Sequence, residues 1–285
     1  MATSALAAMR PRQWTKNLLL FAGIVFAVKI GEAGRWAHAV ASFAAYCAAS
    51  SASYLANDVR DAEYDRRHPV KRWRPVAAGE LAPRDALLLA TILAGAAIAG
   101  VAVLGWQSLA FMAAFLALQA AYTWGLKHLI LLDVMVIAAL FVIRAAAGAA
   151  AVDVRISPWL LLCTALLALF LALGKRHAEL ANNASDSSSG RPVLDGYSPA
   201  LVDQLTSIVA ASTVMAYSMY TFTARDSSAM MVTIPFVLFG IFRYMLLLQR
   251  ARLGEAPEEV VLRDLPLAAT ILGWVVTCGV VLSVT

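Results

Sequence analysis

Nine apolar stretches run along the 285 residues and constrain the fold more than any other feature. A helix rises about 1.5 Å per residue, so about 20 apolar residues cross the roughly 30 Å hydrocarbon core of a bilayer. Hydrophobic residues make up 61% of the chain and charged residues 14%, whereas soluble proteins are about 25% charged. The pattern predicts an all-α, polytopic membrane bundle of nine transmembrane helices. The predicted spans are residues 14–31, 36–56, 84–104, 107–125, 130–150, 157–174, 202–223, 230–248 and 266–284.

The basic residues are divided unevenly between the two sides of these spans. If the N-terminus is cytoplasmic, seventeen Lys and Arg residues fall on inner segments and four on outer segments. This excess follows the positive-inside rule, so we expect a cytoplasmic N-terminus in the inner (cytoplasmic) membrane and an outer C-terminus. The first span follows basic residues as a signal peptide would, but no persuasive cleavage site comes after it, and we expect it to be retained. The net charge of +5 then reflects topology, and no basic soluble face for nucleic acid is present.

A cluster of carboxylates follows the second predicted span. If the helix continues, Asn57, Asp58, Asp61 and Asp65 fall within about a quarter of its circumference. Acids on one narrow face repel each other unless solvent or a divalent cation neutralises them. Hard oxygen ligands at this spacing suit Mg²⁺ that holds a phosphorylated substrate. The alternative interpretation is a solvated, acidic helix end.

Basic residues come directly after the acids, with Lys71 and Arg72 followed by Arg74. A metal-binding acidic face beside a basic segment suits a diphosphate, because the cation bridges phosphate oxygens and Arg or Lys takes the remaining charge. The simpler alternative is that these cations only satisfy the positive-inside rule.

A second polar loop, residues 174–200, is expected to face the first, residues 57–83, over one central cavity that opens to the cytoplasm. It begins with Lys175, Arg176 and Glu179. Lys175 and Glu179 are four residues apart, so a plain helix salt pair is as good an interpretation as a second charged cluster. Residues 182–190 form a low-complexity linker from which we expect no chemistry.

Arg144 lies deep in the fifth predicted span, where a charge is costly and usually faces the bundle interior. It indicates a polar pocket, and the alternative is a carbonyl or carboxylate that simply satisfies it. Lys127, at the start of the same span, is expected to reach the same cavity. The three cysteines all lie in predicted spans and have neither disulfide nor metal-ligand spacing, so we expect them to be packing residues.

The acidic motif, Asn57-Asp58-x-x-Asp61-x-x-x-Asp65, resembles that of the UbiA-type intramembrane prenyltransferases. Downstream, Lys71-Arg72-x-Arg74-Pro75-x-Ala77-Ala78-Gly79 is similar as well. The resemblance covers essentially the whole chain and implies one transmembrane domain over residues 1–285, with Mg²⁺–diphosphate at the first acidic motif. Most of the superfamily has a second motif, Asp-x-x-x-Asp, near the end of the sixth helix. This chain departs from it there, since it has Lys175, Arg176 and Glu179.

Four segments resemble one branch of the superfamily, the decaprenyl-phosphate phosphoribosyltransferases. These segments are residues 10–17, residues 174–176 with Glu179, residues 197–199, and residues 254–259 with 262–264. The resemblance implies transfer of 5-phosphoribose from phosphoribosyl pyrophosphate (PRPP) to decaprenyl (polyprenyl) phosphate, with release of pyrophosphate, for cell-wall arabinan precursors. It implies Mg²⁺ as cofactor. The implied partners are PRPP, the polyprenyl phosphate and the lipid bilayer, and a homo-oligomer is left open.

On this resemblance Asp58, Asp61 and Asp65 are expected to act in catalysis and, with Asn57, to hold the metal. The residues expected to bind substrate are Lys16, Asn17, Asn57, Lys71, Arg72, Arg74, Lys127, Arg144, Lys175, Arg176, Glu179 and Tyr197. Two other functions stay open. One is ordinary prenyl transfer from a prenyl diphosphate to an aromatic acceptor. The other is transport of a lipid or solute, which is disfavoured because the spans show no matching pair of interrupted half-helices.

Overall fold

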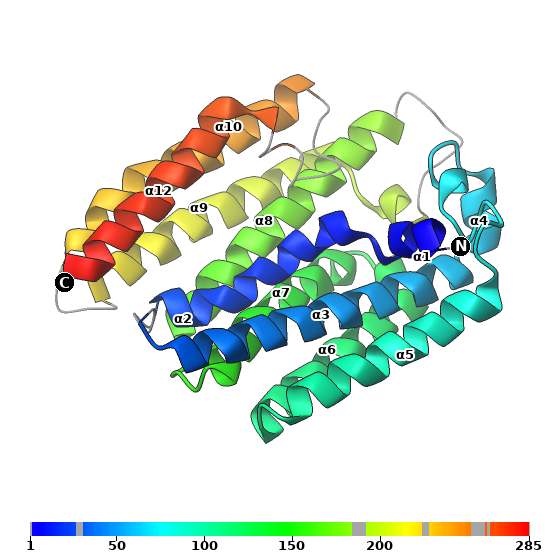
Figure 1. The fold of residues 1–285 in the computed structure, drawn as a ribbon. Helices are drawn as coiled ribbons and strands as arrows, with labels where there is room; N and C mark the ends of the chain where they lie inside the picture. The colour runs from blue at the N-terminus through cyan, green and yellow to red at the C-terminus, as the bar shows by residue number, and fades with distance from the viewer. Residues whose placement is uncertain are drawn as a thin grey trace. The chain divides into compact units, whose positions relative to one another are not determined.

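The computed structural model describes residues 2–26, 31–183, 192–223, 228–251, 260 and 263–284, and these residues contain helices and no strand (Figure 1). Two compact units divide the chain. The N-terminal unit comprises Met1–Leu126 and Leu140–Ile156, and the C-terminal unit comprises Lys127–Ala139 and Ser157–Thr285. Helix α7, Leu132–Ala151, gives its first eight residues to the C-terminal unit and the rest to the N-terminal unit.

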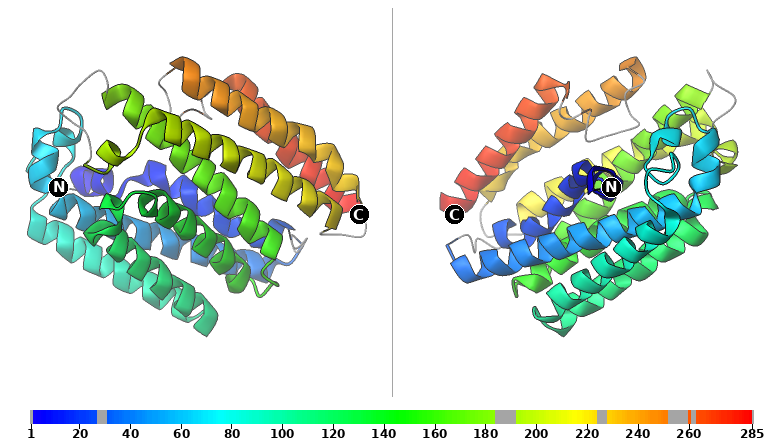
Figure 2. Two further views of the ribbon diagram at one scale, coloured as in Figure 1. Left: turned by 180° about the vertical axis from the view of Figure 1, so that it is seen from behind. Right: turned by 45° about the vertical axis from the view of Figure 1, so that its right-hand side comes forward.

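The N-terminal unit is built around α3, which lies side by side with α5 (Figures 1 and 2). Pro83 occupies the first position of α5, where a missing N–H costs nothing. Gly105, with a φ of 108°, makes the turn between α5 and α6 that a side chain would oppose. The elements are α1 (Ala2–Met9), η1 (Pro11–Phe21), α2 (Ala22–Phe26), α3 (Ala33–Arg60), α4 (Ala62–Arg67), η2 (Lys71–Trp73), α5 (Pro83–Ala102) and α6 (Trp106–Trp124), followed by η3 (Leu126–His128) at the boundary of the two units.

The segment from α1 through η1 to α2 runs along the length of α3. At one end, Ala8 of α1 belongs to a core cluster with Leu55 near the end of α3. At the other end, Ile24 of α2 packs with Ala39 near the start of α3. Between them η1 comes so close to α7 that a Cβ on Gly148 would lie 2.1 Å from the carbonyl oxygen of Leu20. Only glycine allows this approach.

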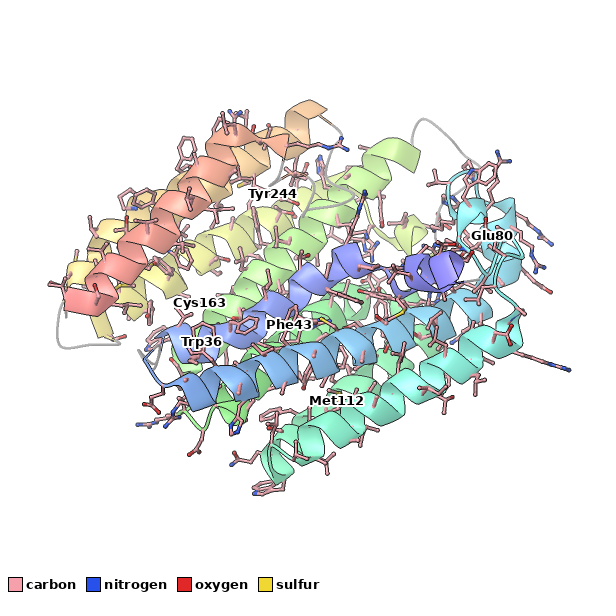
Figure 3. All side chains as sticks on the ribbon, viewed as in Figure 1. Trp36, Phe43, Glu80, Met112, Cys163 and Tyr244 are labelled. Atoms are coloured by element: carbon pink, nitrogen blue, oxygen red, sulfur yellow. The ribbon has the colours of Figure 1, made fainter. Side chains whose placement is uncertain are left out.

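Aromatic side chains hold the α2 end of this segment against α3. The ring of Phe21 lies 6.0 Å from that of Trp36 and 5.4 Å from that of Phe43, measured between centroids. Figure 3 shows Trp36 and Phe43 on α3 at this end, whereas Glu80 lies at the opposite end of the helix. Tilted aromatic pairs at such distances are favourable beyond their buried area.

The C-terminal unit packs α8 beside α9 and α10 beside α12. Its core contains Phe170 of α8 and Tyr244 of α10, whose ring centroids are 5.3 Å apart. Figure 3 labels Tyr244. Proline begins α8 and α9, as it began α5. Besides the start of α7, its elements are α8 (Pro158–Asn183), η4 (Pro192–Gly196), α9 (Pro199–Thr223), η5 (Ser228–Thr233), α10 (Ile234–Ala251) and α12 (Leu265–Val284).

Seven helices in the described ranges are long and apolar enough to cross a membrane, so the predicted number of nine is wrong. Predicted span 14–31 falls on η1 and α2, which are short pieces of 3-10 and α-helix instead of one long apolar helix. Predicted span 107–125 falls on α6, whose Gln107 and Gln119 lower its mean hydropathy. The seven segments are Ala33–Arg60, Pro83–Ala102, Leu132–Ala151, Pro158–Ala181, Pro199–Thr223, Ser228–Gln249 and Leu265–Val284.

Large apolar side chains are exposed on these helices. Leu88 of α5 is 61% exposed, and Leu272 of α12 is 65% exposed. Such surfaces are unfavourable in water and suit lipid tails, while the helical backbone satisfies its own hydrogen bonds. The all-helical class and the membrane setting predicted from the sequence are therefore confirmed. The central cavity and the single domain stay predictions.

Candidate active site

Two aspartates of the acidic motif meet at one arginine in the N-terminal unit. Arg74 donates from one guanidinium nitrogen to Asp65 Oδ2 over 2.6 Å and to Asp58 Oδ1 over 3.3 Å. Asp58 is 1% exposed and Asp65 2% exposed. A shared cation is what two crowded, buried carboxylates require. The second oxygen of Asp58, Oδ2, is buried with no hydrogen-bond partner.

Arg10 supplies a second cation to Asp58. It donates from Nη2 to the same oxygen, Oδ1, that Arg74 contacts, and its guanidinium lies 5.0 Å from the ring centroid of Tyr54. Ser51 positions this part of the chain on α3, because its hydroxyl accepts from Trp14 Nε1 at 3.0 Å and donates to the Met9 carbonyl at 3.0 Å. Sequence reasoning missed the role of Arg10, which is 48 residues from Asp58. No local pattern signals that pairing.

The acids do not lie on one continuous helix as predicted. Helix α3 ends at Arg60, and α4 begins at Ala62 after Asp61, whose φ is −90° and ψ 4°. Hydrogen bonds still connect Asp61 N to the Asn57 carbonyl and Asp65 N to the Asp61 carbonyl, at 2.9 and 2.8 Å. The i to i+4 pattern therefore survives the break, and Asp58 and Asp65 keep nearly the same face. Asp61 is half-buried and accepts from Asn57 Nδ2 at 3.1 Å.

The loop after α4 folds back to bring Arg74 to the acids. Arg66 donates to the Ala77 carbonyl over 3.3 Å, which ties α4 to the loop. Turns within the loop are closed by Ala78 N to the Arg74 carbonyl at 2.8 Å and by Leu81 N to the Pro75 carbonyl at 3.1 Å. Arg74 thus brings the basic segment against the acids, and its predicted contact with phosphate stays a prediction.

The other two predicted cations of the loop lie elsewhere on its surface. Arg72 is exposed and its guanidinium lies 4.9 Å from the ring centroid of Trp73. Lys71 is half-buried, with Nζ 5.7 Å from the ring centroid of Tyr64. Their predicted role as phosphate ligands stays a prediction.

A separate buried network occupies the C-terminal unit, centred on Arg176. Its Nε donates to Asp133 Oδ2 over 2.7 Å, and its Nη1 donates to Glu179 Oε2. Arg176 is 1% exposed and Asp133 is fully buried. Sequence reasoning missed Asp133 as the partner of Arg176, although an acid in the first turn of an apolar helix signals a buried polar contact.

Tyr197 completes this network and fixes the turn before α7. Its hydroxyl donates to Asp133 Oδ1 over 2.6 Å and accepts from Leu131 N at 2.8 Å. Leu131 has a φ of 67°, which is unfavourable for a residue other than glycine. Burial and the hydrogen bond to Asp133 both raise the pKa of Tyr197, so it stays protonated and keeps donating.

The remaining predicted residues divide between the two units. Lys16 is half-buried on η1, and Asn17 beside it is fully buried and accepts from Arg144 Nε at 2.8 Å. Lys127 and Lys175 are half-buried in the C-terminal unit. Cys47 and Cys278 are buried and all three cysteines are free, in agreement with a packing role. Residues 184–191, 254–259 and 262 lie outside the described ranges.

The family of the chain follows from its match to a known family model. Residues 18–260 match the model of the UbiA prenyltransferase family. The chain belongs to that family. This UbiA-family chain is thus a multi-pass membrane protein, and the expected resemblance is confirmed.

Named relatives match along nearly the whole chain. It is 38% identical over 292 residues to the decaprenyl-phosphate phosphoribosyltransferase of Mycolicibacterium smegmatis, covering 95% of this chain and 90% of the relative. It is 34% identical over 278 residues to the protein of the same name from Mycobacterium tuberculosis, covering 95% and 92%.

A solved structure shares the fold. A UbiA homolog from Archaeoglobus fulgidus, determined with GPP and Mg²⁺ bound, superimposes with a TM-score of 0.76. The match covers 98% of this chain and 99% of the homolog at 19% identity. At that identity the likeness is one of fold.

Proposed function

We propose that this UbiA-family chain is a membrane phosphoribosyltransferase that moves 5-phosphoribose from PRPP to decaprenyl or another polyprenyl phosphate. The observation that carries the proposal is the match over 95% of the chain to two relatives named decaprenyl-phosphate phosphoribosyltransferase. The product would be a phosphoribosyl-phosphoryl polyprenol, a precursor for cell-wall arabinan, and pyrophosphate would be released.

The acidic site suits a divalent metal. Mg²⁺ usually binds proteins through one or two carboxylates and completes its shell with substrate phosphates and water. Asp58 and Asp65 are two such carboxylates. The buried Oδ2 of Asp58 has no hydrogen-bond partner and could serve as an oxygen ligand. Within the described ranges no group of three or more His, Cys, Asp or Glu residues could hold a metal ion. Substrate phosphates and water would complete the shell of an ion held by the two aspartates.

Asp58 and Asp65 would hold Mg²⁺, with Asp61 and Asn57 beside them, and the bound ion would neutralise charge on the pyrophosphate leaving group. Arg74 and Arg10 already face the two acids. With a diphosphate present, their guanidinium groups would bind its remaining oxygens and keep it oriented. Their fixed positive charge would favour the state in which negative charge builds up on the leaving group.

In the transfer, the bond from the ribose C1 to pyrophosphate breaks and pyrophosphate leaves with the electron pair. An oxygen of the polyprenyl phosphate forms the new bond to C1. A phosphate monoester is already ionised at neutral pH, so no protein group has to remove a proton. The protein's contribution is to orient two anionic substrates and to screen their mutual repulsion.

The orientation belongs to the same proposal. A soluble donor with several negative charges cannot cross about 30 Å of hydrocarbon unaided. We therefore place the acidic site on the cytoplasmic side of the inner membrane, and the lipid acceptor reaches it from within the bilayer.

Transfer in proteoliposomes tests the function. Purified protein is incubated with PRPP labelled in the ribose and with decaprenyl phosphate, and label is measured in the lipid extract. We expect Mg²⁺-dependent entry of label into lipid, and a loss of more than about 10²-fold in Asp58→Asn and Asp65→Asn. The matched control is Asp85→Asn, because Asp85 is exposed at the start of α5 and outside the acid cluster.

The same assay separates the alternatives. An ordinary prenyltransferase would instead attach a labelled prenyl group to an aromatic acceptor and leave decaprenyl phosphate unchanged. A transporter would move label into the vesicle lumen with no covalent change. Either result, with no label in lipid, would overturn the proposal.

A further inference from the structure

Helix α3 carries a polar stripe that leads from the acidic site into the bundle. Tyr46, Ser50, Tyr54 and Asp58 are spaced four residues apart, so they lie one above another along one face. From Asp58 to Tyr46 the stripe extends roughly 18 Å along the helix axis. We call these four residues the α3 polar stripe.

Three of its members have buried polar atoms with no hydrogen-bond partner in the described structure. These atoms are the Tyr46 hydroxyl, the Ser50 hydroxyl and Asp58 Oδ2. Each of the three side chains is 1% exposed. A buried polar group without a partner is costly. Asp58 Oδ2 is already assigned to the metal, so the hydroxyl groups of Tyr46 and Ser50 indicate a further polar ligand.

A buried cation, Arg144, lies near the Tyr46 end of the stripe. Arg144 of α7 is 4% exposed. Its guanidinium lies 4.7 Å from the ring centroid of Phe115, and the Tyr46 ring lies 5.1 Å from the same ring. Arg144 and Tyr46 therefore both pack against the ring of Phe115.

The contacts of Arg144 leave its charge uncompensated. It donates from Nε to Asn17 at 2.8 Å and from Nη1 to the Leu140 carbonyl at 3.1 Å, and both acceptors are neutral. Among the described residues no carboxylate pairs with Arg144. A buried charged residue in a membrane helix usually pairs with an opposite charge or with a backbone carbonyl. Within the described ranges Arg144 has the carbonyl and no opposite charge.

We propose that Arg144, Tyr46 and Ser50 form a subsite for a phosphomonoester, separate from the acids that take the pyrophosphate. A phosphomonoester dianion has three strong acceptor oxygens, and the subsite offers two hydroxyl donors and a guanidinium. The choice of phosphomonoester rests on the proposed function, since both of its substrates carry one. These are the 5-phosphate of the sugar donor and the phosphate of the lipid acceptor.

The test uses ligand-induced stabilisation, because it needs no turnover. Thermal unfolding midpoints of the full-length protein in nanodiscs are measured with increasing ribose 5-phosphate and, in a second arm, with decaprenyl phosphate. A ligand that binds the folded state raises the midpoint. Stabilisation by ribose 5-phosphate assigns the subsite to the sugar donor, and stabilisation by decaprenyl phosphate assigns it to the lipid.

The variants are Tyr46→Phe and Ser50→Ala, which remove one hydroxyl each and keep the packing. Each should weaken binding of the effective probe by roughly tenfold, the value of a hydrogen bond to a charged group. Ser108→Ala is the matched control, because Ser108 of α6 is also a buried serine with an unpartnered hydroxyl and lies off the stripe. It should bind the probe like the wild type.

The outcomes are distinct from those of the transfer assay. If neither probe stabilises the wild type, or if Tyr46→Phe and Ser50→Ala bind the effective probe as well as Ser108→Ala does, the subsite is wrong even where phosphoribosyl transfer occurs. In turnover, the two stripe variants should raise KM for the substrate whose phosphate is bound and change kcat less. A protein that transfers no phosphoribose yet binds ribose 5-phosphate through Tyr46 and Ser50 would retain the subsite and lose the proposed function.

Discussion

Arg176 of α8 donates to Asp133 of α7 over 2.7 Å, and neither side chain is more than 1% exposed. This pair connects two helices of the C-terminal unit and is extended by Glu179 and Tyr197. It stands where most of the superfamily is expected to have its second acidic motif. The replacement puts a network there in which one guanidinium, that of Arg176, donates to two carboxylates.

Removal of Arg176 should destabilise the fold. Arg176→Met leaves Asp133 buried without its cation, and loss of one partner of a buried pair costs about 3–5 kcal/mol. We expect a markedly lower thermal midpoint in detergent, measured by fluorescence-detected size exclusion. The double variant Arg176→Met with Asp133→Leu should recover much of the loss, because the fully buried carboxylate is then gone and Glu179, which is 15% exposed, can be solvated.

His177→Ala is the control for this prediction. His177 contacts Asp203, which is largely exposed at 61%, so its removal should change stability little. Equal midpoints for Arg176→Met and His177→Ala would show that the buried pair does not hold the helices. Arg176 would then be better explained as a substrate ligand, as the sequence predicted.

The helical class and the acidic motif could be predicted from the sequence because both depend on local spacing. The length of an apolar run can be compared with the thickness of the bilayer. The spacing of Asp58 and Asp65 shows that they would lie on the same face of a helix. The number of spans could not be predicted in the same way. The segment from Pro11 to Phe26 is made of η1 and α2, and the close approach of η1 to Gly148 depends on tertiary packing.

The partners that residues contact over long separations could not be predicted from the sequence either. Arg10 reaches Asp58, and Asp133 reaches both Arg176 and Tyr197, across separations of 43 to 64 residues. A single sequence shows that a buried charge needs a partner, but it does not show which residue the fold supplies. Arg144 illustrates the useful part of that rule, because it is buried with Asn17 and the Leu140 carbonyl as polar partners, while the predicted pocket stays a prediction.

Arg74 should compete with the divalent cation for the acids. Its guanidinium nitrogen contacts both Asp58 and Asp65, and nearby positive charge opposes metal binding. Arg74→Gln should therefore lower the Mg²⁺ concentration that gives half-maximal transfer, while it raises KM for PRPP because a phosphate contact is lost. The measurement is a Mg²⁺ titration of transfer at several PRPP concentrations. Arg84→Gln is the control, since Arg84 is exposed at the start of α5 and lies outside the acid cluster. An unchanged Mg²⁺ requirement in Arg74→Gln would contradict the assignment.

Gly148 should not tolerate a side chain. A Cβ there would lie 2.1 Å from the Leu20 carbonyl oxygen, so Gly148→Ala must push η1 away from α7. Overpacking of this kind costs about 1–3 kcal/mol or more. Gly95→Ala in α5 is the matched control, because nothing lies within 4 Å of its added Cβ. We expect a lower thermal midpoint for Gly148→Ala and an unchanged or slightly higher one for Gly95→Ala. Similar midpoints for the two variants would show that η1 does not contact α7 this closely.

The two ends of α3 should lie on opposite sides of the membrane, with the acidic site inside the cell. Glu80 is exposed in the loop at the Asp58 end of α3. Arg155 is exposed near the start of α3, because it follows Val152 and Asp153, whose carbonyl groups accept from Arg35.

Single cysteines are placed at Glu80 and at Arg155 in a background without Cys47, Cys163 and Cys278. A membrane-impermeant thiol reagent added to intact cells should label position 155 and spare position 80, and permeabilisation should make position 80 reactive. The reverse labelling would place the acids on the side where a cytoplasmic donor cannot reach them, and the phosphoribosyl proposal would then fail on topology alone.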